Sequence, residues 1–482
     1  MSLLFNFLSG ATKTDFFTVW ASGDSHPVRE DITYSYKSLQ TALSDIDAEN
    51  WDIGINVGDF WNTNVETEAG GEEIVNQFSN GLSVHNREDI YCIGGNHDGQ
   101  DDDEPNGANW LFKRYIDPEG TQPAFSGVVN ANRPYQINGT YENYYLDVGN
   151  IRFLFMTDRQ DGEPPMGEKG LASSPTPDVW RLSGGVSLST WQWLHDQVLK
   201  NPDKIIIISF HQAIYETTIG SGFQEFSNYG VLSRIDEESD YRGSFSYYDN
   251  ALHNDEIIHF LDAVNGSIDM WLSGHLHHRI GDSYNGRGTY VYKHGIHHKN
   301  VCQLTKNLQP TGAKPLTVHS YFLDFYQNQI IQRAYIHFDN DSVYSKGFNT
   351  DFDASYNINK IFTKSYITPT ITAPTTQVTG AAISNEQSDS LDLSWNTNST
   401  GVVIARWAVG DPVFTPVDGT TYYRDEPATS GAVIFQGTAS SFTDYGRSSG
   451  TTYYYKIYTY NAGGDQIKYN TTSPISINGT TL

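Results

Sequence analysis

The segment IYCIGGNHD, residues 90–98, decides the fold of this chain. A short apolar run is followed, after two glycines, by side chains that can bind a metal ion. Four other apolar runs end in the same way: FFTVWAS (16–22), IGINV (53–57), KIIIIS (204–209) and IDMWLS (268–273) precede GDSH (23–26), GD (58–59), FH (210–211) and GHLH (274–277). The repetition predicts one site that is built from five segments.

The apolar runs predict buried strands of a parallel sheet, because both faces of such strands lie under helices. In an open α/β sheet, residues just beyond the carboxyl ends of the strands line one crevice. Seven nitrogen and oxygen ligands are therefore expected to converge: Asp24, His26, Asp59, Asn96, His211, His275 and His277.

Seven ligands exceed what one tetrahedral ion accepts, and they suit two ions that share a bridging carboxylate. No cysteine belongs to the set. Imidazole and carboxylate ligands without thiolate favour Mn, Fe or Zn over softer metals. The expected cofactor is therefore a pair of divalent or trivalent transition-metal ions.

The ordered motifs DxH, GD, GNH[DE], H and GHxH resemble those of the calcineurin-like metallophosphoesterase family over residues 15 to about 340. The resemblance implies a four-layer αββα sandwich. It also implies that residues matching Asp24, His26 and His277 hold one ion, and that Asp59 bridges the two ions. The second ion would be held by Asn96, His211 and His275.

Local geometry gives further expectations for the motif residues. Asp24 and His26 are two apart, so in an extended segment their side chains emerge on the same side. Adjacent side chains point apart, which turns His97 away from the metals when Asn96 is a ligand. His97 is therefore the candidate electrophile or general acid that faces the substrate, and Asp98 is the candidate that orients its ring.

The resemblance implies hydrolysis of a phosphate mono- or diester by attack of a metal-bound hydroxide. His97 would stabilise the developing oxyanion or protonate the departing alkoxide. The motifs do not separate monoesters from diesters, because the family hydrolyses nucleotides, phosphoproteins, phospholipids and nucleic acid ends.

Charge narrows the expected substrates. The chain has 57 acidic and 30 basic residues and a formal net charge of −27. This balance opposes long nucleic acids, whose binding depends on Lys and Arg contacts to phosphates. Two bound cations would reverse the local field, so a phosphate ester in the crevice is still attracted. The expected substrate is a small ester or an ester carried on a surface polymer.

The cysteines and the first residues bear on the compartment. Cys92 and Cys302 are the only cysteines, and they offer no disulfide framework. Residues 1–17 lack a basic region, and Asn6 interrupts their apolar stretch. We therefore expect no signal peptide and no membrane span.

Helical spacing predicts three helices: one carrying Tyr36, Leu39, Leu43 and Ile46, one beginning near Ser189 with a capping-box pattern, and one over about 255–264. Residues 99–148, 158–187 and 212–252 are predicted to be insertions around the crevice mouth. The acidic run 101–104 is expected to be a solvated loop rather than a calcium site. Three histidines near a strand end, interpreted mainly as structural residues, are also candidates to touch substrate: His294, His297 and His298.

The C-terminal part has a different character. Residues 365–377 are rich in Pro and Thr, as in a linker, and short alternating strands follow. Trp395 and the strand containing Tyr453 resemble the core tryptophan and the tyrosine corner of a fibronectin type III domain. The predicted organisation is an N-terminal segment (1–14), a phosphoesterase domain (15–364), a linker (365–377) and an immunoglobulin-like, all-β fibronectin type III-like domain (378–482).

The opposite face of the tyrosine-corner strand carries Tyr454, Lys456, Tyr458 and Tyr460. These side chains either stack on sugar rings or pack against a neighbouring segment, and packing is the favoured interpretation.

Two classes of biological role stay open at this point. The first is a virion-associated enzyme of a phage tail, released by lysis, that trims a phosphorylated cell-surface polymer while the C-terminal domain binds the particle or the host. The second is a structural or adhesion protein that uses the phosphoesterase domain as a binding module. A secreted bacterial phosphatase or nucleotidase and a cytoplasmic location are further alternatives.

Overall fold

The computed structural model describes most of the 482 residues. The described residues are 16–26, 38–61, 67–95, 98, 109–157, 184–186, 188–221, 245–247, 255–301, 303–304, 317–339 and 342–482. Contacts group the chain into two compact units. Unit 1 comprises 1–190, 207–254 and 269–364, and unit 2 comprises 191–206, 255–268 and 365–482. The domain boundaries expected from the sequence stay a prediction.

The first sheet of unit 1 has the order β17-β16-β15-β1-β2-β3. Three of its strands come from the predicted apolar runs and are parallel: β1 (Phe17–Ser22), β2 (Ile53–Asn56) and β3 (Ile90–Cys92). Antiparallel strands extend the sheet on the other side of β1: β15 (Thr317–Tyr326), β16 (Gln329–Asp339) and β17 (Gly347–Asn357). All described residues of β1, β2 and β3 are buried, as the apolar runs predict.

The second sheet has the order β13-β14-β10-β8-β6-β5-β4. Its strands are β4 (Asn138–Gly139), β5 (Asn143–Val148), β6 (Ile151–Met156), β8 (Ile205–Ser209), β10 (Met270–Ser273), β13 (Tyr290–Lys293) and β14 (Ile296–Asn300). Strands β8, β10 and β14 are parallel. The two sheets pack face to face, since the ring of Phe153 on β6 lies 6.1 Å from Phe17 and 5.8 Å from Phe325.

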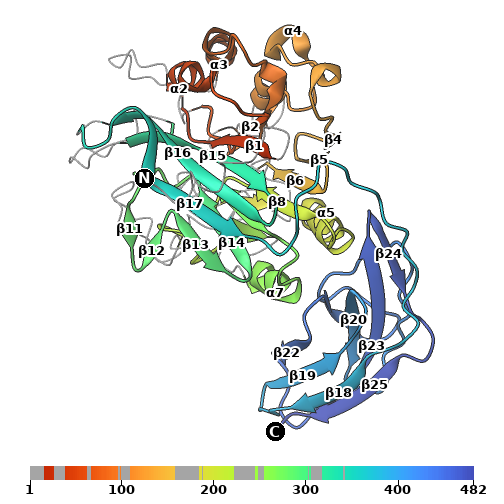
Figure 1. The fold of residues 1–482 in the computed structure, drawn as a ribbon. Helices are drawn as coiled ribbons and strands as arrows, with labels where there is room; N and C mark the ends of the chain where they lie inside the picture. Colours follow the sequence, from red (N-terminus) through yellow and green to blue (C-terminus); the bar gives the residue numbers. More distant parts are fainter. Residues whose placement is uncertain are drawn as a thin grey trace. The chain divides into compact units, whose positions relative to one another are not determined.

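Helices α2 (Ser38–Ile46) and α3 (Glu68–Gly81) cover the outer face of the first sheet (Figure 1). Leu39, Leu43 and Ile46 of α2 are fully buried, which confirms the predicted spacing. Helix α3 was not predicted; Thr67 caps its N-terminus through a bond from the Gly70 amide to Oγ1. The two sheets and their helices confirm the predicted α/β fold.

The predicted insertions contain short structured elements. They are η3 (Phe112–Ile116), α4 (Pro123–Ser126), η4 (Asn130–Asn132) and the paired strands β7 (Gly184–Val186) and β9 (Phe245–Tyr247), besides β4 and β5. Two further elements lie outside the predicted insertions: η2 (Arg87–Asp89) and the pair of β11 (Ser283–Tyr284) with β12 (Arg287–Gly288). The acidic run 101–104 lies outside the described residues. No helix among the described residues combines the length and apolar character that a membrane crossing requires.

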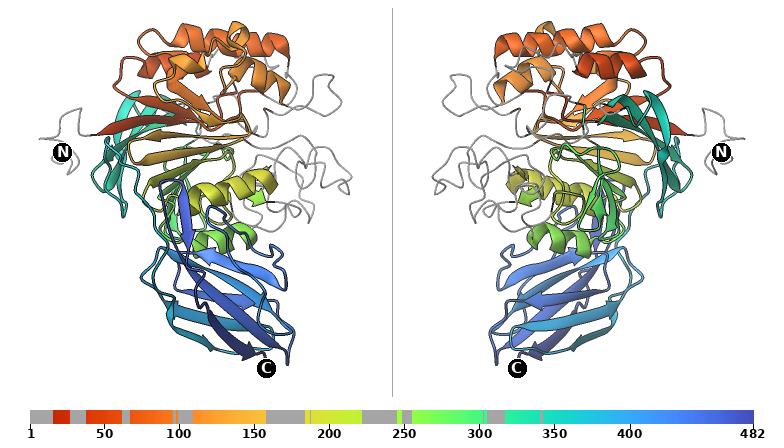
Figure 2. Two further views of the ribbon diagram at one scale, coloured as in Figure 1. Left: turned by 90° about the vertical axis from the view of Figure 1, so that its right-hand side faces the viewer. Right: turned by 90° about the vertical axis from the view of Figure 1, so that its left-hand side faces the viewer.

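Unit 2 contains an all-β sandwich, drawn in blue in Figure 2. One sheet has the order β18-β19-β22, and the other has β21-β20-β23-β24, with β25 paired to β23. The strands are β18 (Thr379–Ser384), β19 (Ser390–Asn396), β20 (Gly401–Trp407), β21 (Ala432–Gly437), β22 (Ser441–Tyr445), β23 (Thr452–Gly463), β24 (Gln466–Tyr469) and β25 (Ile475–Thr480).

The sandwich core confirms the predicted key residues. Trp395 packs in the cluster with Tyr453. The Tyr453 hydroxyl accepts a hydrogen bond from the Ser448 amide at 3.0 Å, as in a tyrosine corner. Tyr458 and Tyr460 are buried in a second cluster with Phe414 and so pack within the protein, as favoured above.

Unit 2 also includes the helix α7 (Asp255–Ala263) and most of the helix α5 (Leu188–Leu199). The carbonyl of Ala263 accepts hydrogen bonds from the amides of Thr438 and Ala439. Asn201, just after α5, exchanges two hydrogen bonds with Asp465, at 3.0 and 3.2 Å. The C-terminal sandwich therefore packs with two helices that lie between the phosphoesterase motifs in the sequence. Helix α5 precedes the motif FH, and helix α7 precedes the motif GHLH.

Candidate metal centre

The described candidate ligands all follow the carboxyl ends of strands. Asp24 and His26 follow β1, and Asp59 follows β2. His211 follows β8, whereas His275 and His277 follow β10. Every one of these side chains is buried or nearly so. The structure brings the six residues together, and Asn96 and His97 lie outside the described residues.

The backbone at this site is unusual, because five of the six ligands have a positive φ angle. The values are 53° for Asp24, 35° for His26, 62° for Asp59, 68° for His275 and 41° for His277. Left-handed backbone at non-glycine residues costs about 1–3 kcal/mol each and is concentrated at functional sites. The expected extended conformation of Asp24 and His26 is therefore wrong: a sharply turning backbone, not strand alternation, aims both side chains at one place.

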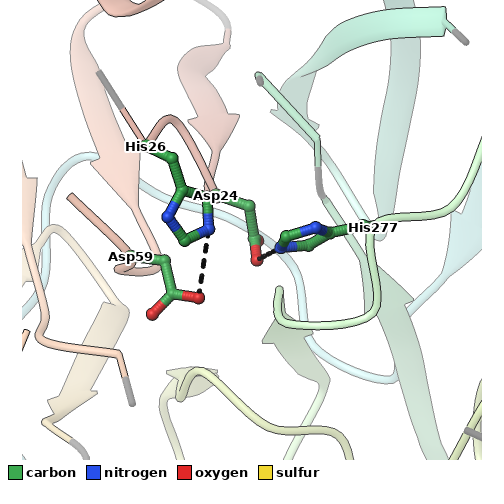
Figure 3. A group of neighbouring side chains, drawn as sticks. All are labelled: Asp24, His26, Asp59 and His277. Atoms are coloured by element: carbon green, nitrogen blue, oxygen red, sulfur yellow. Dashed lines mark ion pairs between the residues drawn. The ribbon is translucent and has the colours of Figure 1, made fainter. Parts of the chain in front are cut away.

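The first group consists of Asp24, His26, Asp59 and His277, and their candidate ligand atoms lie within 4.8 Å of one another. His277 Nε2 lies 2.8 Å from Asp24 Oδ1, and His26 Nε2 lies 3.4 Å from Asp59 Oδ2 (Figure 3). Figure 3 shows that the four side chains point toward one another from the loops that follow β1, β2 and β10.

The second group consists of Asp59, His211 and His275, again within 4.8 Å of one another. His211 Nε2 lies 3.1 Å from the same Asp59 Oδ2. The rings of His211 and His275 are 5.1 Å apart between centroids. Asp59 is therefore shared by both groups, which is the arrangement expected of a bridging carboxylate.

Backbone carbonyls orient two of the imidazoles. His26 Nδ1 lies 2.6 Å from the Trp61 carbonyl oxygen, and His211 Nδ1 lies 2.7 Å from the Val57 carbonyl oxygen. In each case the Nδ1–H donates, so Nε2, which faces Asp59, is the nitrogen that takes up a proton or a metal ion. Such outer hydrogen bonds fix the tautomer of a metal-binding histidine.

The electrostatics of the groups favour positive charge between the carboxylates. Burial alone lowers the pKa of an imidazole, but the Asp59 carboxylate overcomes this effect and raises the pKa of His211 to about 10. Burial and the neighbouring His211 lower the pKa of His275 to about 3. The field of Asp24 and Asp59 thus attracts a cation, and a metal ion would replace the proton.

These donors fit the metals that the sequence predicts. Two groups of nitrogen and oxygen atoms share one carboxylate oxygen, so each group can contribute to one ion. Asp24, His26 and His277 would hold one ion together with Asp59, and His211 and His275 would hold the other together with Asp59.

Asp98 has a role that the sequence did not predict. Its Oδ2 accepts hydrogen bonds from the amides of Asp59 and Gly95, and its Oδ1 accepts from those of Phe60 and Trp61. Burial and the Asp59 carboxylate raise the pKa of Asp98 to about 7, and the amides of Gly95, Trp61 and Phe60 oppose that rise. The predicted contact with His97 involves a residue outside the described part of the chain and stays a prediction.

Asn300 is a second residue that sequence reasoning missed. Its buried Nδ2 donates to the Gly274 carbonyl oxygen at 2.6 Å and so supports the loop of His275. The available signal was its place at the end of β14, next to β10 in the sheet.

Both ring nitrogens of His297 are occupied, by the Tyr290 hydroxyl and the Asn357 carbonyl, each at 2.8 Å. His297 is therefore a structural residue.

Comparisons with known proteins place the chain in a family. No curated protein matches it. Among solved structures, a dimetal phosphatase from Danio rerio is 13% identical over 71% of this chain and 99% of that chain, with a TM-score of 0.41. GAP50, the anchor in the inner membrane complex of Plasmodium, is 12% identical over 72% and 90%, with a TM-score of 0.38. A fibronectin type III domain of human collagen XX is 15% identical over 23% and 98%, with a TM-score of 0.15.

The family model of calcineurin-like phosphoesterases matches residues 17–279, more than half of the chain. The match spans all six described ligands. The chain therefore belongs to the calcineurin-like phosphoesterase family and is a metal-dependent phosphoric ester hydrolase.

Proposed function

We propose that the chain hydrolyses a phosphate monoester or diester at a centre of two transition-metal ions. The observation that carries the proposal is the shared carboxylate, since Asp59 Oδ2 lies 3.4 Å from His26 Nε2 and 3.1 Å from His211 Nε2. When two ions are bound at such a site, they activate water and neutralise charge on the phosphoryl oxygens. Mn, Fe and Zn all suit the donors.

The protein's own residues prepare this chemistry. Asp24 and Asp59 supply the negative charge that concentrates cations, and the backbone carbonyls of Trp61 and Val57 fix the imidazoles of His26 and His211. His97 is proposed to face the substrate, where it would donate to a phosphoryl oxygen or to the leaving group. Asn96 is proposed as a ligand of the second ion.

The proposed substrate is a small phosphate ester or one carried on a surface polymer. The formal net charge of −27 disfavours a long nucleic acid polyanion. At the site itself, the metal cations would attract a single phosphoryl group.

The proposed biological role is that of a virion-associated enzyme, such as a phage tail protein, acting on a phosphorylated cell-surface polymer. The fibronectin type III-like sandwich supports this role as a candidate attachment domain. Immunogold labelling of purified particles with an antibody to residues 378–482 would test the role, and absence of label from intact particles would reject it.

A side-by-side assay tests the enzymatic proposal. The metal-loaded full chain is incubated with p-nitrophenyl phosphate and with bis(p-nitrophenyl) phosphate, and the Asp59→Asn variant serves as the control. We expect turnover of at least one ester by the wild type only. Equal release of p-nitrophenol by both proteins, or by neither, would favour the binding-module alternative.

A further inference from the structure

The carboxylate of Asp98 joins two loops that carry metal ligands. The side chain is 1% exposed, and both oxygens accept backbone hydrogen bonds. Oδ1 accepts from Phe60 at 2.7 Å and from Trp61 at 3.1 Å. Oδ2 accepts from Asp59 and from Gly95, both at 2.8 Å. A carboxylate has about four acceptor positions, so these amides use its full capacity.

Three of the four donors are consecutive amides of one loop, those of Asp59, Phe60 and Trp61. Successive amides that converge on one anion form a concave nest around it. Asp59 adopts a left-handed φ of 62°, a conformation that other contacts must maintain. The carboxylate of Asp98 stabilises that conformation, because it accepts hydrogen bonds from the amide of Asp59 and from the two amides that follow.

The same contacts reach both predicted ions. The Trp61 amide donates to Asp98, and the Trp61 carbonyl oxygen accepts from His26 Nδ1 at 2.6 Å. The Gly95 amide also donates to Asp98, and the next residue is the proposed ligand Asn96. The loops are tightly apposed, since a Cβ placed on Gly95 would lie 2.3 Å from Asp59 Oδ1. Asp98 therefore accepts hydrogen bonds from Asp59 itself, from Trp61, which binds His26, and from Gly95, which precedes Asn96 in the sequence.

We propose that Asp98 is a positioning residue that holds the bridging carboxylate of Asp59 at the separation at which one oxygen can serve two ions. The proposal rests on the dinuclear centre proposed above. It assigns Asp98 no contact with substrate or metal. Its effect is transmitted through the backbone of the loops that carry the ligands.

Asp117 provides a matched control. It is also 1% exposed, and it also accepts four hydrogen bonds, from Thr121 N, Thr121 Oγ1, Gln122 N and Ser126 Oγ. These partners carry no metal ligand. Asp98→Asn and Asp117→Asn therefore replace the same buried side chain and remove a similar set of hydrogen bonds, but only the first change touches the ligand loops.

The experiment titrates the metal-free full chain with Mn²⁺ by calorimetry and records the electron paramagnetic resonance signal of a coupled manganese pair. We expect Asp98→Asn to weaken binding of the second Mn²⁺ by about 10- to 100-fold, as is usual for outer partners of metal ligands, and to lose the coupled signal. Asp117→Asn should lower the melting temperature but leave both dissociation constants unchanged. Asp98→Glu, which restores the charge and acceptors at a different reach, should bind the second ion with intermediate affinity.

Wild-type affinity and a coupled signal in Asp98→Asn would overturn the proposal, as would equal weakening by Asp117→Asn. If Asp98→Asn does not fold, Asp98→Glu decides the question: weaker second-ion binding than in the wild type supports positioning, and unchanged binding overturns it. Failure of both variants to fold would assign Asp98 to fold stability alone and also overturn it. Failure of the proposed function is distinguishable, because the wild type itself would then bind fewer than two ions.

Discussion

The backbone amide of His275 donates to both carboxylate oxygens of Asp24, at 2.9 and 3.0 Å, although 251 residues separate them. Asp24 also pairs with His277, whose Nε2 lies 2.8 Å from Oδ1. The first ligand loop of the chain therefore holds the last ligand loop in place. These two loops of the centre are thus joined by contacts between the candidate ligands themselves.

Asp24→Ala is expected to remove one ion of the two and to abolish turnover. The change takes away a ligand and both acceptors of the His275 amide, so the loop of His275 and His277 loses its anchor. Metal content per chain, measured by mass spectrometry of the elements, checks the loss. Retention of two ions by the folded variant would contradict the assignment of Asp24.

The purified wild type, reconstituted with Mn²⁺ or Zn²⁺, is expected to hold about two ions per chain, because the two described groups share one bridge. Elemental analysis after gel filtration gives the ratio. A folded sample that holds one ion or fewer per chain would contradict the assignment of Asp59 as a bridge between two ions.

Asp59→Asn and His97→Ala are expected to fail in different ways. A neutral amide bridges two cations poorly, so Asp59→Asn should lower the occupancy of both ions and abolish turnover. His97→Ala should keep both ions and lose turnover by roughly 10²- to 10⁴-fold, the usual contribution of a positioned acid or electrophile. Parallel metal and rate measurements separate the two. Loss of metal from His97→Ala would show that His97 acts as a ligand.

The stability of unit 2 is expected to fall in acid because of His195. Its ring stacks on Phe260 at 4.0 Å, and burial lowers its pKa to about 3. Below pH 6.5 the unfolded chain binds a proton that folded His195 rejects until about pH 3, so the free energy of unfolding decreases as the pH falls through this window. The loss is about 2 kcal/mol at pH 5.

Urea unfolding of His195→Phe at pH 8 and pH 5 checks this sign. The variant should lose less stability between the two pH values than the wild type does. An identical loss in both proteins would show that His195 does not carry the effect.

Truncation after Ile367 is expected to keep hydrolysis of a small aryl phosphate within about tenfold, which corresponds to about 1.4 kcal/mol of barrier. All described ligands precede the cut. The melting temperature should fall by several degrees, because Ala263 loses the amides of Thr438 and Ala439, and Asn201 loses Asp465. Calorimetry and the rate assay on residues 1–367 and the full chain give both quantities. A larger loss of rate would show that the C-terminal residues support the active site.

The sequence predicted that the six described candidate ligands converge, and the physical reason is simple. Buried parallel strands leave long apolar runs, and their carboxyl ends converge whatever the intervening loops do. Asp24, Asp59 and His211 could therefore be assigned to one place from pattern alone. The five positive φ angles could not be predicted, since glycine is the residue type that indicates left-handed backbone in a sequence, and these five residues are Asp and His.

The role of Asp98 was also beyond pattern. Its partners, Asp59, Phe60 and Trp61, lie 37 to 39 residues away, and they bind through backbone amides that any residue type possesses. The motif GNHD suggested only that Asp98 orients the ring of the neighbouring His97. The grouping of α5 and α7 with the C-terminal strands was hidden for a similar reason, because the apolar faces of helices do not specify which surface covers them.

The interleaved sequence of unit 2 has a consequence for synthesis. Helices α5 and α7 leave the ribosome long before β21 and the residues that follow it, including the amides that bind the Ala263 carbonyl. Domains usually fold as they emerge. Here a nascent chain can complete unit 1 before Ala263 of α7 and Asn201 after α5 meet their hydrogen-bond partners, which lie more than 150 residues downstream. Contacts at such separation form slowly. Premature termination would thus yield chains in which the Ala263 carbonyl lacks the amides of Thr438 and Ala439, and Asn201 lacks Asp465.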